Sequence, residues 1–238
     1  MTIDELVAAT HAQMKVHSDS KFAEGVRNFF VEPVDAWGVR SANLKSVEQM
    51  VYRELKRMSA ADRNKYCNKL WKSGKLEDGM LICHVYRRFA PECGVCEFKL
   101  FESWIDKYVH NWANCDGVSS WLLSASIANE PALKSALPAW TKSRNRWKRR
   151  AAAVSLLQEA KKGRGAEEIF RIARELAHDP DEMVQKGVGW LLKETYSKRP
   201  EAVVAFLEET RPPRRVVRYA AEKMTAADKS KFGLGLRN

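Results

Sequence analysis

The chain has 238 residues and a formal net charge of +11, because 41 lysines and arginines outnumber 30 aspartates and glutamates. This length can supply a substantial core for one large or two small domains. The sequence lacks both a long apolar run and the basic, apolar start of a signal peptide, so it predicts neither a membrane span nor secretion. Five cysteines at scattered spacings favour a reducing, cytoplasmic location over a disulfide framework.

Apolar residues recur with helical periodicity along the whole chain, and the alternation typical of β-strands is almost absent. Short polar turns rich in Pro, Asp, Ser and Gly separate the periodic segments. The predicted helices cover residues 2–17, 22–30, 42–57, 60–72, 77–89, 97–112, 118–127, 131–140, 145–160, 165–177, 181–197, 200–209 and 213–224.

This succession of helices predicts an all-α fold, an α-solenoid of HEAT-like antiparallel helix pairs with a concave basic face. New helices begin at intervals of roughly 35 residues, close to the range of HEAT repeats, although the segments share little identity. A compact, non-repetitive helical bundle is the alternative. Because no low-complexity linker divides the chain, we expect residues 1–238 to form a single domain.

The first candidate site lies where a predicted helix ends. Ile105 and Val109 occur at helical spacing and, together with Trp104, are expected in the core. Trp112 is predicted at the helix end, four residues before Asp116, where a cap or turn presents both side chains at one surface. The structural alternative is that the Asp116 carboxylate caps the N-terminus of the next helix. The two roles are compatible, because an N-capping carboxylate is fixed in orientation and held ionised.

Positive charge is concentrated in residues 141–165. This stretch holds nine lysines and arginines and one acid, so it carries +8 of the net charge of +11. A polyanion is the natural partner of such a concentration. The cationic candidates on its predicted helix and the preceding turn are Arg144, Arg146, Lys148, Arg149 and Arg150. Arg150 is preferred over Arg149, because it lies near the same side as Val154 and can hold a phosphate bidentately at the edge of a packed surface.

A third segment centres on Trp190. The apolar stripe from Met183 to Leu192 is expected to be buried, and Trp190 falls at its margin. Gly187, three residues earlier, removes side-chain bulk beside it. Two interpretations stay open, because a large aromatic at the border of a core either packs there or serves as a stacking platform.

Three motifs follow one another along the chain: Trp112-x-x-x-Asp116, Trp147-x-x-Arg150-Ala151-Ala152 and Gln185-Lys186-Gly187-Val188-Gly189-Trp190-x-Leu192. Weaker support comes from Trp37-Gly38-Val39-Arg40 and Arg214-Arg215-x-x-x-Tyr219-Ala220. In order, spacing and overall length these segments resemble the DNA alkylation repair family of HEAT-like-repeat DNA glycosylases. The resemblance covers essentially the whole chain.

The resemblance implies an enzyme that binds double-stranded DNA containing alkylated bases and removes cationic lesions such as N3-methyladenine and N7-methylguanine. It implies that Asp116 is the catalytic carboxylate, that Trp112 and Trp190 contact the nucleotide, and that Arg150 contacts a phosphate. The chemistry is consistent with a site without histidine, since a cationic base leaves as a neutral group and needs no acid.

The resemblance also implies further DNA contacts. Those carried over from its motifs are Lys186, Arg214 and Arg215. An N-terminal aromatic that approaches the DNA is assigned to Phe29 or Phe30, in front of the loop of residues 31–36.

Other chemistry has little support in the sequence. Cys93-Gly-Val-Cys96 resembles half of a zinc site, but a second pair at metal spacing is missing, so no metal is expected. No Gly-rich phosphate loop or Ser/His/Asp arrangement occurs, so no cofactor is expected. We expect a monomer. Two other functions compete: a non-catalytic binder of damaged or branched DNA with the same fold, and a helical scaffold whose basic face binds acidic proteins or RNA.

Overall fold

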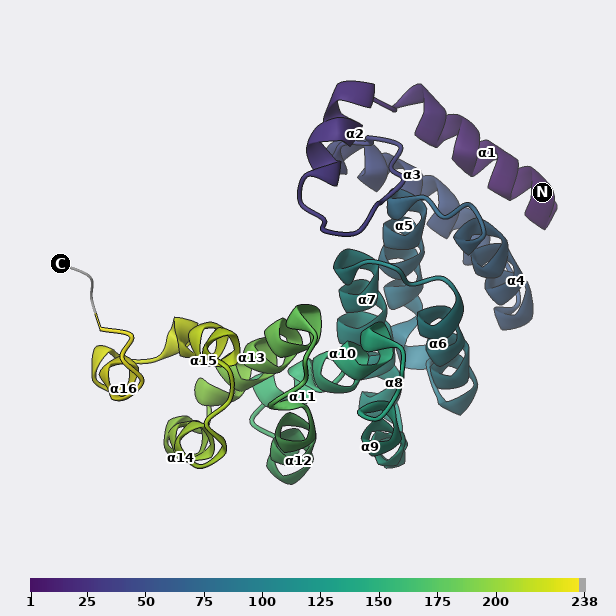
Figure 1. The fold of residues 1–238 in the computed structure, drawn as a ribbon. Helices are drawn as coiled ribbons and strands as arrows, with labels where there is room; N and C mark the ends of the chain where they lie inside the picture. Colours follow the sequence, from purple (N-terminus) through teal and green to yellow (C-terminus); the bar gives the residue numbers. More distant parts are fainter. Residues whose placement is uncertain (236–238) are drawn as a thin grey trace. The chain divides into compact units, whose positions relative to one another are not determined.

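The computed structural model describes residues 1–235, which form helices joined by short turns (Figure 1). Within this range there is no strand beyond an isolated bridge between Asp35 and Lys75. The all-α prediction is confirmed. Contacts divide the chain into two compact units. Unit 1 comprises Met1–Ala90 and Tyr108–Gly117, and unit 2 comprises Pro91–Lys107 and the chain from Val118 onward.

Unit 1 is built around α5, which packs against α3, α4 and α7. Its helices are α1 (Ile3–Val16), α2 (Ser20–Arg27), α3 (Ser41–Leu55), α4 (Ala60–Trp71), α5 (Leu76–Tyr86) and α7 (Trp112–Gly117). A 3-10 helix, η1 (Arg87–Glu92), follows α5. The α5–α7 contact is close because α5 carries Gly79, where a Cβ atom would lie 2.4 Å from Asn114 Nδ2. The glycine therefore sets the distance between α5 and the helix that carries Trp112 and Asp116.

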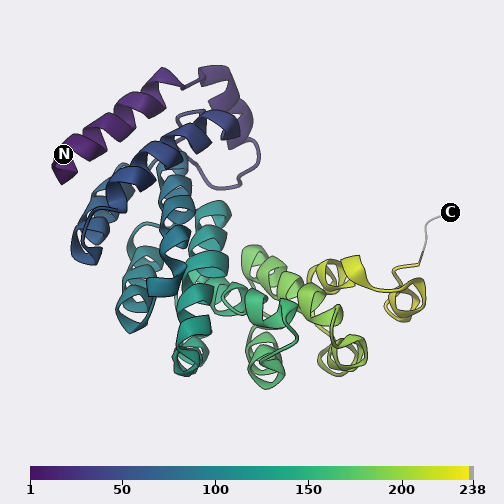
Figure 2. The same ribbon diagram turned by 180° about the vertical axis from the view of Figure 1, so that it is seen from behind.

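Unit 2 contains the remaining helices. They are α6 (Val95–Lys107), the π-helical η2 (Val118–Leu123), α8 (Ser124–Asn129), η3 (Pro131–Ala136), α9 (Leu137–Trp140), α10 (Arg146–Val154), α11 (Leu157–Lys161), α12 (Ala166–Leu176), α13 (Glu182–Tyr196), α14 (Pro200–Thr210), α15 (Arg214–Ala220), η4 (Ala221–Lys223) and α16 (Ala226–Lys231). Figures 1 and 2 show α13 between α10 and α15, and it packs extensively against both.

Two glycines allow α13 to approach both neighbours. A Cβ atom on Gly187 would lie 3.2 Å from Arg150 Cγ of α10, and one on Gly189 would lie 2.4 Å from Tyr219 Cβ and 3.0 Å from the Val216 carbonyl oxygen of α15. Since distances below about 3.4 Å are repulsive for carbon atoms, larger residues would push the helices apart. Gly187 and Gly189 therefore fix which sides of α13 are covered.

Several predicted boundaries are wrong. The helix expected at 97–112 ends at Lys107, where the Asn145 side-chain amide donates to the Ile105 carbonyl at 3.2 Å. The helix expected at 145–160 is interrupted between Val154 and Leu157. Its interruption coincides with a hydrogen bond of 2.6 Å from the Ser124 hydroxyl to the Ser155 carbonyl. Both changes depend on side chains distant in sequence, which a local pattern does not contain.

Two shorter elements also differ from the prediction. The segment expected as one helix at 131–140 is the 3-10 helix η3 followed by the single turn α9. The short helix α16 was not predicted. Within residues 1–235, no helix is both long enough and apolar enough to cross a membrane.

The packing of α13 gives a first prediction. Gly189→Ala should lower the free energy of unfolding by about 1–3 kcal/mol, because the added methyl group meets backbone as well as side chain. Gly25→Ala is the matched control. That glycine lies inside α2 with nothing within 4 Å of an added Cβ atom, so the change should stabilise by about 0.5–1 kcal/mol. Urea unfolding measures both, and equal effects would contradict the packing argument.

Candidate nucleic-acid interface

Trp112 and Asp116 share one face of α7. They are one helical turn apart and both side chains are partly exposed. The N-terminus of α7 is capped by Asn111, whose Oδ1 accepts the Asn114 backbone N–H at 2.9 Å. Asp116 lies inside α7 and does not cap a following helix, because η2 continues directly from Gly117. The N-cap interpretation of Asp116 is therefore wrong, while the expectation that Trp112 and Asp116 lie at one surface agrees with the helix.

Phe30 stacks on Trp112. Their ring centroids are 5.3 Å apart with an interplanar angle of 21°, and the Trp112 indole N–H donates to the Phe29 carbonyl at 3.4 Å. On its other side, Phe30 packs against a small buried cluster that includes Ala23 and Leu76. The indole is therefore held from one side by the core. Of the two aromatics left open by the sequence, Phe30 is the one that supports Trp112.

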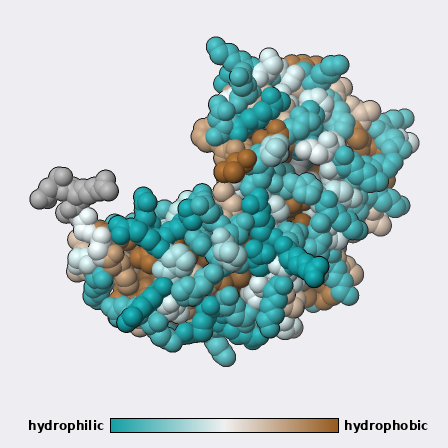
Figure 3. All heavy atoms as spheres, viewed as in Figure 1, coloured by the Kyte–Doolittle hydropathy of each residue, from teal (hydrophilic) through white to brown (hydrophobic). Residues whose placement is uncertain are grey.

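Phe29 lies on the surface beside this pair. Its side chain is 77% exposed, and that of Val31 is 85% exposed. Figure 3 shows apolar surface at the loop that joins α2 to α3, which contains both residues. Large apolar side chains exposed next to an aromatic–carboxylate pair are a feature of interaction surfaces rather than of cores.

Two carboxylates of α5 hold the loop that carries Phe30. Glu77 accepts hydrogen bonds from the backbone N–H groups of Trp37, Gly38 and Val39 at 2.9, 2.7 and 3.0 Å. The same three residues belong to the motif singled out as weaker support for the family resemblance. Gly38 has a φ of 79°, a conformation that favours glycine, and it lies against the Asp19 carbonyl with no room for a side chain.

Asp78 extends this network. Its side chain is fully buried, and it accepts from the Trp37 indole N–H at 3.0 Å and pairs with His11 Nε2 at 2.9 Å. The hydrogen bond that His11 makes to the Asp78 carboxylate raises the pKa of His11 above its usual value, against the opposing effect of partial burial. The protonation state of His11 is thus linked to the anchoring of the Trp37 loop.

Trp190 lies on the strip of α13 that neither neighbour covers. Its side chain is partly exposed, as is that of Lys186 one turn earlier. Within residues 1–235, the Trp190 side chain makes no ring contact or hydrogen bond. It is therefore a partly exposed indole one turn after Lys186, and its role as a stacking platform stays a prediction.

Arg150 is buried, with 5% of its surface exposed. Its guanidinium donates to the Met183 carbonyl at the start of α13, and its aliphatic part lies against Gly187. The sequence suggested that the missing side chain of Gly187 leaves room for Trp190. In the structure the Arg150 side chain lies against Gly187 instead. The guanidinium is fixed by α13, and its contact with a phosphate stays a prediction.

The neighbouring cations fall into two groups. Arg149 forms an ion pair with Asp179 at 2.6 Å and donates to the Ser143 carbonyl, while Lys148 pairs with Glu102 and Asp106. Arg146 pairs with Asp181 at 3.1 Å. Arg144, in contrast, is exposed and has no side-chain partner within residues 1–235. The structure thus separates cations that form ion pairs around α10 from Arg144, which faces solvent. The high positive charge of residues 141–165 alone did not make this distinction.

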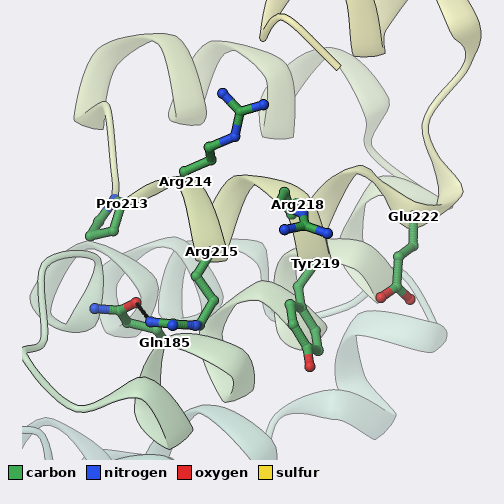
Figure 4. A pocket seen from close by; sticks show the side chains of 7 residues that line it. All are labelled: Gln185, Pro213, Arg214, Arg215, Arg218, Tyr219 and Glu222. Atoms are coloured by element: carbon green, nitrogen blue, oxygen red, sulfur yellow. Dashed lines mark hydrogen bonds between the residues drawn. The ribbon is translucent and has the colours of Figure 1, made fainter. Parts of the chain in front are cut away.

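Further cations line a depression of about 720 Å³ beside α15 (Figure 4). Arg215 donates to Gln185 Oε1 at 3.1 Å and pairs with Glu182, so it braces α15 against α13. Arg214 extends to the other side of α15 in Figure 4. Arg218 lines the depression, is exposed, and was missed by the sequence analysis. Its signal was the four-residue spacing from Arg214, which places both on one helix at neighbouring turns.

Cys93 and Cys96, which resemble half of a zinc site in the sequence, differ in their exposure to solvent. Cys93 is buried and Cys96 is exposed. Within the described part of the chain, no group of three or more His, Cys, Asp and Glu side chains is placed to hold a metal ion.

Comparison with solved structures identifies proteins with the same fold. A predicted DNA alkylation repair enzyme from Enterococcus faecalis aligns over 88% of this chain and 97% of its own, with a TM-score of 0.77 and 13% identity. The protein smu.31 from Streptococcus mutans UA159 aligns over 77% and 94%, with a TM-score of 0.58 and 21% identity. AlkD2 from Streptococcus mutans aligns over 75% and 89%, with a TM-score of 0.57 and 21% identity. No curated protein matches the chain.

A family model described as DNA alkylation repair enzyme matches residues 10–224, which span both units. The chain therefore belongs to the DNA alkylation repair enzyme family. The matched range contains the aromatic–carboxylate pair of α7, the α13 strip and the cations of α15. The family resemblance and the fold expected from the sequence are both confirmed.

The network around Asp78 gives a pH-dependent prediction. Because the pKa of His11 is raised in the folded protein, the ion pair contributes fully below the unfolded value of about 6.5 and is lost as the pH rises through the raised value. The free energy of unfolding of wild type should therefore exceed that of His11→Gln, as measured in urea. This difference should be larger at acidic pH than at alkaline pH. A difference that does not change with pH would contradict the assignment.

Proposed function

We propose that this protein is a monofunctional DNA glycosylase that hydrolyses the N-glycosidic bond of positively charged alkylated purines, such as N3-methyladenine and N7-methylguanine. The observation that carries the proposal is the pair on α7. A partly exposed carboxylate, Asp116, lies one turn from an indole, Trp112, whose ring is held by Phe30. Membership of the DNA alkylation repair enzyme family supports the choice of alkylated DNA as the substrate class.

The reaction needs a negative charge and a water molecule at the sugar. As the bond between C1′ and the purine nitrogen breaks, its electron pair neutralises the base and leaves positive charge on the sugar. A carboxylate stabilises this oxocarbenium-like sugar and orients the water whose oxygen bonds to C1′. The water then loses a proton to Asp116 or to solvent. No acid is required for the departing base, because it leaves as a neutral molecule.

Each of the two indoles is proposed to stabilise positive charge on the nucleotide. An indole face attracts a nearby cation by about 0.5–2 kcal/mol, and the attraction applies to the alkylated base and to the developing charge on the sugar. Trp112 is suited to this role because Phe30 and the Phe29 carbonyl fix its ring. Trp190 is suited to it because its ring is partly exposed and makes no ring contact or hydrogen bond within residues 1–235. In this proposal Phe29 is the exposed aromatic that approaches the DNA.

DNA phosphates would be held by the cations that protein acids do not neutralise. In unit 2 these include Arg144, Lys186, Arg214 and Arg218, all without side-chain ion pairs within the described residues. Arg146, Lys148, Arg149 and Arg215 are partly neutralised by their ion pairs and would contribute less. Arg150 is proposed as a phosphate contact whose orientation is fixed by the Met183 carbonyl.

The working form that we propose is a cytoplasmic monomer that acts without metal or cofactor. This part of the proposal rests on the scattered cysteines and on chemistry that needs only a carboxylate and water.

Substitution of the carboxylate tests the enzyme hypothesis. Asp116→Asn should lower the release of N7-methylguanine from methylated DNA by about 10²–10³-fold, because the charge that stabilises the sugar is lost, while DNA affinity is retained. Glu24→Gln, an exposed acid of α2, is the control and should leave release unchanged. Base release is followed by mass analysis. Equal release by wild type and Asp116→Asn removes Asp116 from the mechanism, and DNA binding without release by wild type favours a non-catalytic DNA-binding function.

The phosphate contacts are tested by salt dependence. The triple variant Arg144→Gln, Lys186→Gln and Arg218→Gln should reduce the slope of log affinity against log salt by about 2.7, since each phosphate contact contributes about 0.9. Lys15→Gln, Lys21→Gln and Lys99→Gln together make the same charge change at exposed positions and serve as the control. If both triple variants change the slope equally, the effect is one of net charge and the proposed contacts are misplaced.

A further inference from the structure

Unit 1 carries a second basic surface that lies apart from Trp112 and Asp116. It is an open depression of about 730 Å³ at the C-terminal ends of α3 and α5. Its lining residues are Gln49, Tyr52, Arg53, Lys56, Arg57 and Arg88. The four cations among them are exposed, and no acid lines the depression within residues 1–235. We refer to it as the α3–α5 basic surface.

Arg88 is held in place by stacking. Its guanidinium carbon lies 3.5 Å from the centroid of the Tyr52 ring, and Tyr52 in turn contacts the buried Phe89 with ring centroids 5.4 Å apart. Within the described residues the Arg88 guanidinium makes no hydrogen bond or ion pair. A guanidinium stacked through its face keeps the N–H donors of its edge available for a planar or tetrahedral oxyanion.

The other cations of the surface are only partly compensated. Arg57 pairs with Glu54 at 3.3 Å, and the Arg53 Nε donates to the Gln49 carbonyl at 3.3 Å, which leaves the terminal nitrogens of Arg53 unused by that bond. Lys56 has no side-chain partner within residues 1–235. Cations at the end of α3 are stabilised by its helix dipole, but Arg88 belongs to a different element, so the dipole of α3 does not account for its place in the cluster.

The α3–α5 basic surface and the candidate site use opposite ends of α5. The first residues of α5, Leu76 to Asp78, hold the loop that carries Phe30, whereas Arg88 lies two residues beyond the last residue of α5. The helix has 11 residues, a length of about 16 Å. An anion bound at Arg88 is therefore not the phosphate next to the nucleotide at Trp112.

We propose that the α3–α5 basic surface binds the phosphate backbone of a second DNA segment, independently of the segment held at the candidate site. Guanidinium donors match carboxylate and phosphate oxygens alike, and DNA is favoured over an acidic peptide because the chain belongs to a DNA alkylation repair enzyme family. Such a contact binds without regard to sequence or damage. It keeps the protein on undamaged DNA, and the proposal stands whether or not the protein excises bases.

The test measures stoichiometry and salt dependence on undamaged DNA. The triple variant Arg53→Gln, Lys56→Gln and Arg88→Gln is compared with wild type and with the variant Lys15→Gln, Lys21→Gln and Lys99→Gln, which makes the same charge change elsewhere. A 12-bp duplex is titrated at low salt and the bound number is determined by analytical ultracentrifugation. Wild type and the control should bind two duplexes, and the α3–α5 variant should bind one.

A second measurement separates this inference from the proposed glycosylase function. The α3–α5 variant should release N7-methylguanine from a short methylated duplex at the wild-type rate, while its affinity for undamaged duplex at the second site falls at least tenfold. The wild-type protein could release no base while the α3–α5 variant still binds one duplex fewer than wild type. In that case the second site stands and the glycosylase proposal fails.

Three results would overturn the second site. The first is an unchanged number of bound duplexes in the α3–α5 variant, and the second is an equal loss in the control variant. The third is displacement of the second duplex by a polyglutamate decamer at equal charge concentration, which would show that any polyanion occupies the surface. Arg88→Lys is expected to lower the affinity of this site in part, because it keeps the charge but loses the stacked, bidentate geometry.

Discussion

Close approach of helices at glycine is the constraint on which both candidate surfaces depend. In unit 2, Gly189 lets α13 contact α15 at a distance that no larger residue allows, and Gly187 leaves room for the Arg150 side chain of α10 against α13. With those two sides covered, the strip with Lys186 and Trp190 is what remains exposed. In unit 1, Gly79 does the same for α5 and α7, and so sets the position of the helix that carries Asp116. In each unit the residue without a side chain decides where the reactive side chains face.

The charges buried on α5 have a different function from the charges on the surface. Glu77 and Asp78 are shielded from water and compensated by backbone N–H groups, an indole and His11. Each therefore avoids the high cost of an unpaired buried carboxylate, and together they order the loop alongside its apolar contacts through Phe30 and Ala36. Phe30 and Trp112 depend on that loop. The electrostatics of unit 1 thus arrange its aromatic residues before any ligand is present.

The sequence predicted features that depend on local pattern or on family motifs. The all-α fold and most helices follow from periodicity, and the placement of Trp112 and Asp116 on one side follows from their four-residue spacing. Partners distant in the chain could not be predicted. The cap of α7 by Asn111, the ion pair of Arg149 with Asp179 and the contact of Gly187 with Arg150 all require the packed structure. Arg88 was missed because the sequence does not show that it stacks on Tyr52, whereas Arg218 was missed although its four-residue spacing from Arg214 was visible.

The π-helical turn of η2 bears on how this chain is compared with others. A π turn has the geometry of one extra residue accommodated in an α-helix, and here it begins two residues after Asp116. The sequence pattern suggested a new helix at this point, whereas the chain continues from α7 directly into the π turn. A relative whose helix is regular throughout would have one residue fewer between the carboxylate and the apolar stripe. An alignment that allows no gap there would pair Asp116 with the wrong residue, and an acid would be scored as absent where it is only displaced.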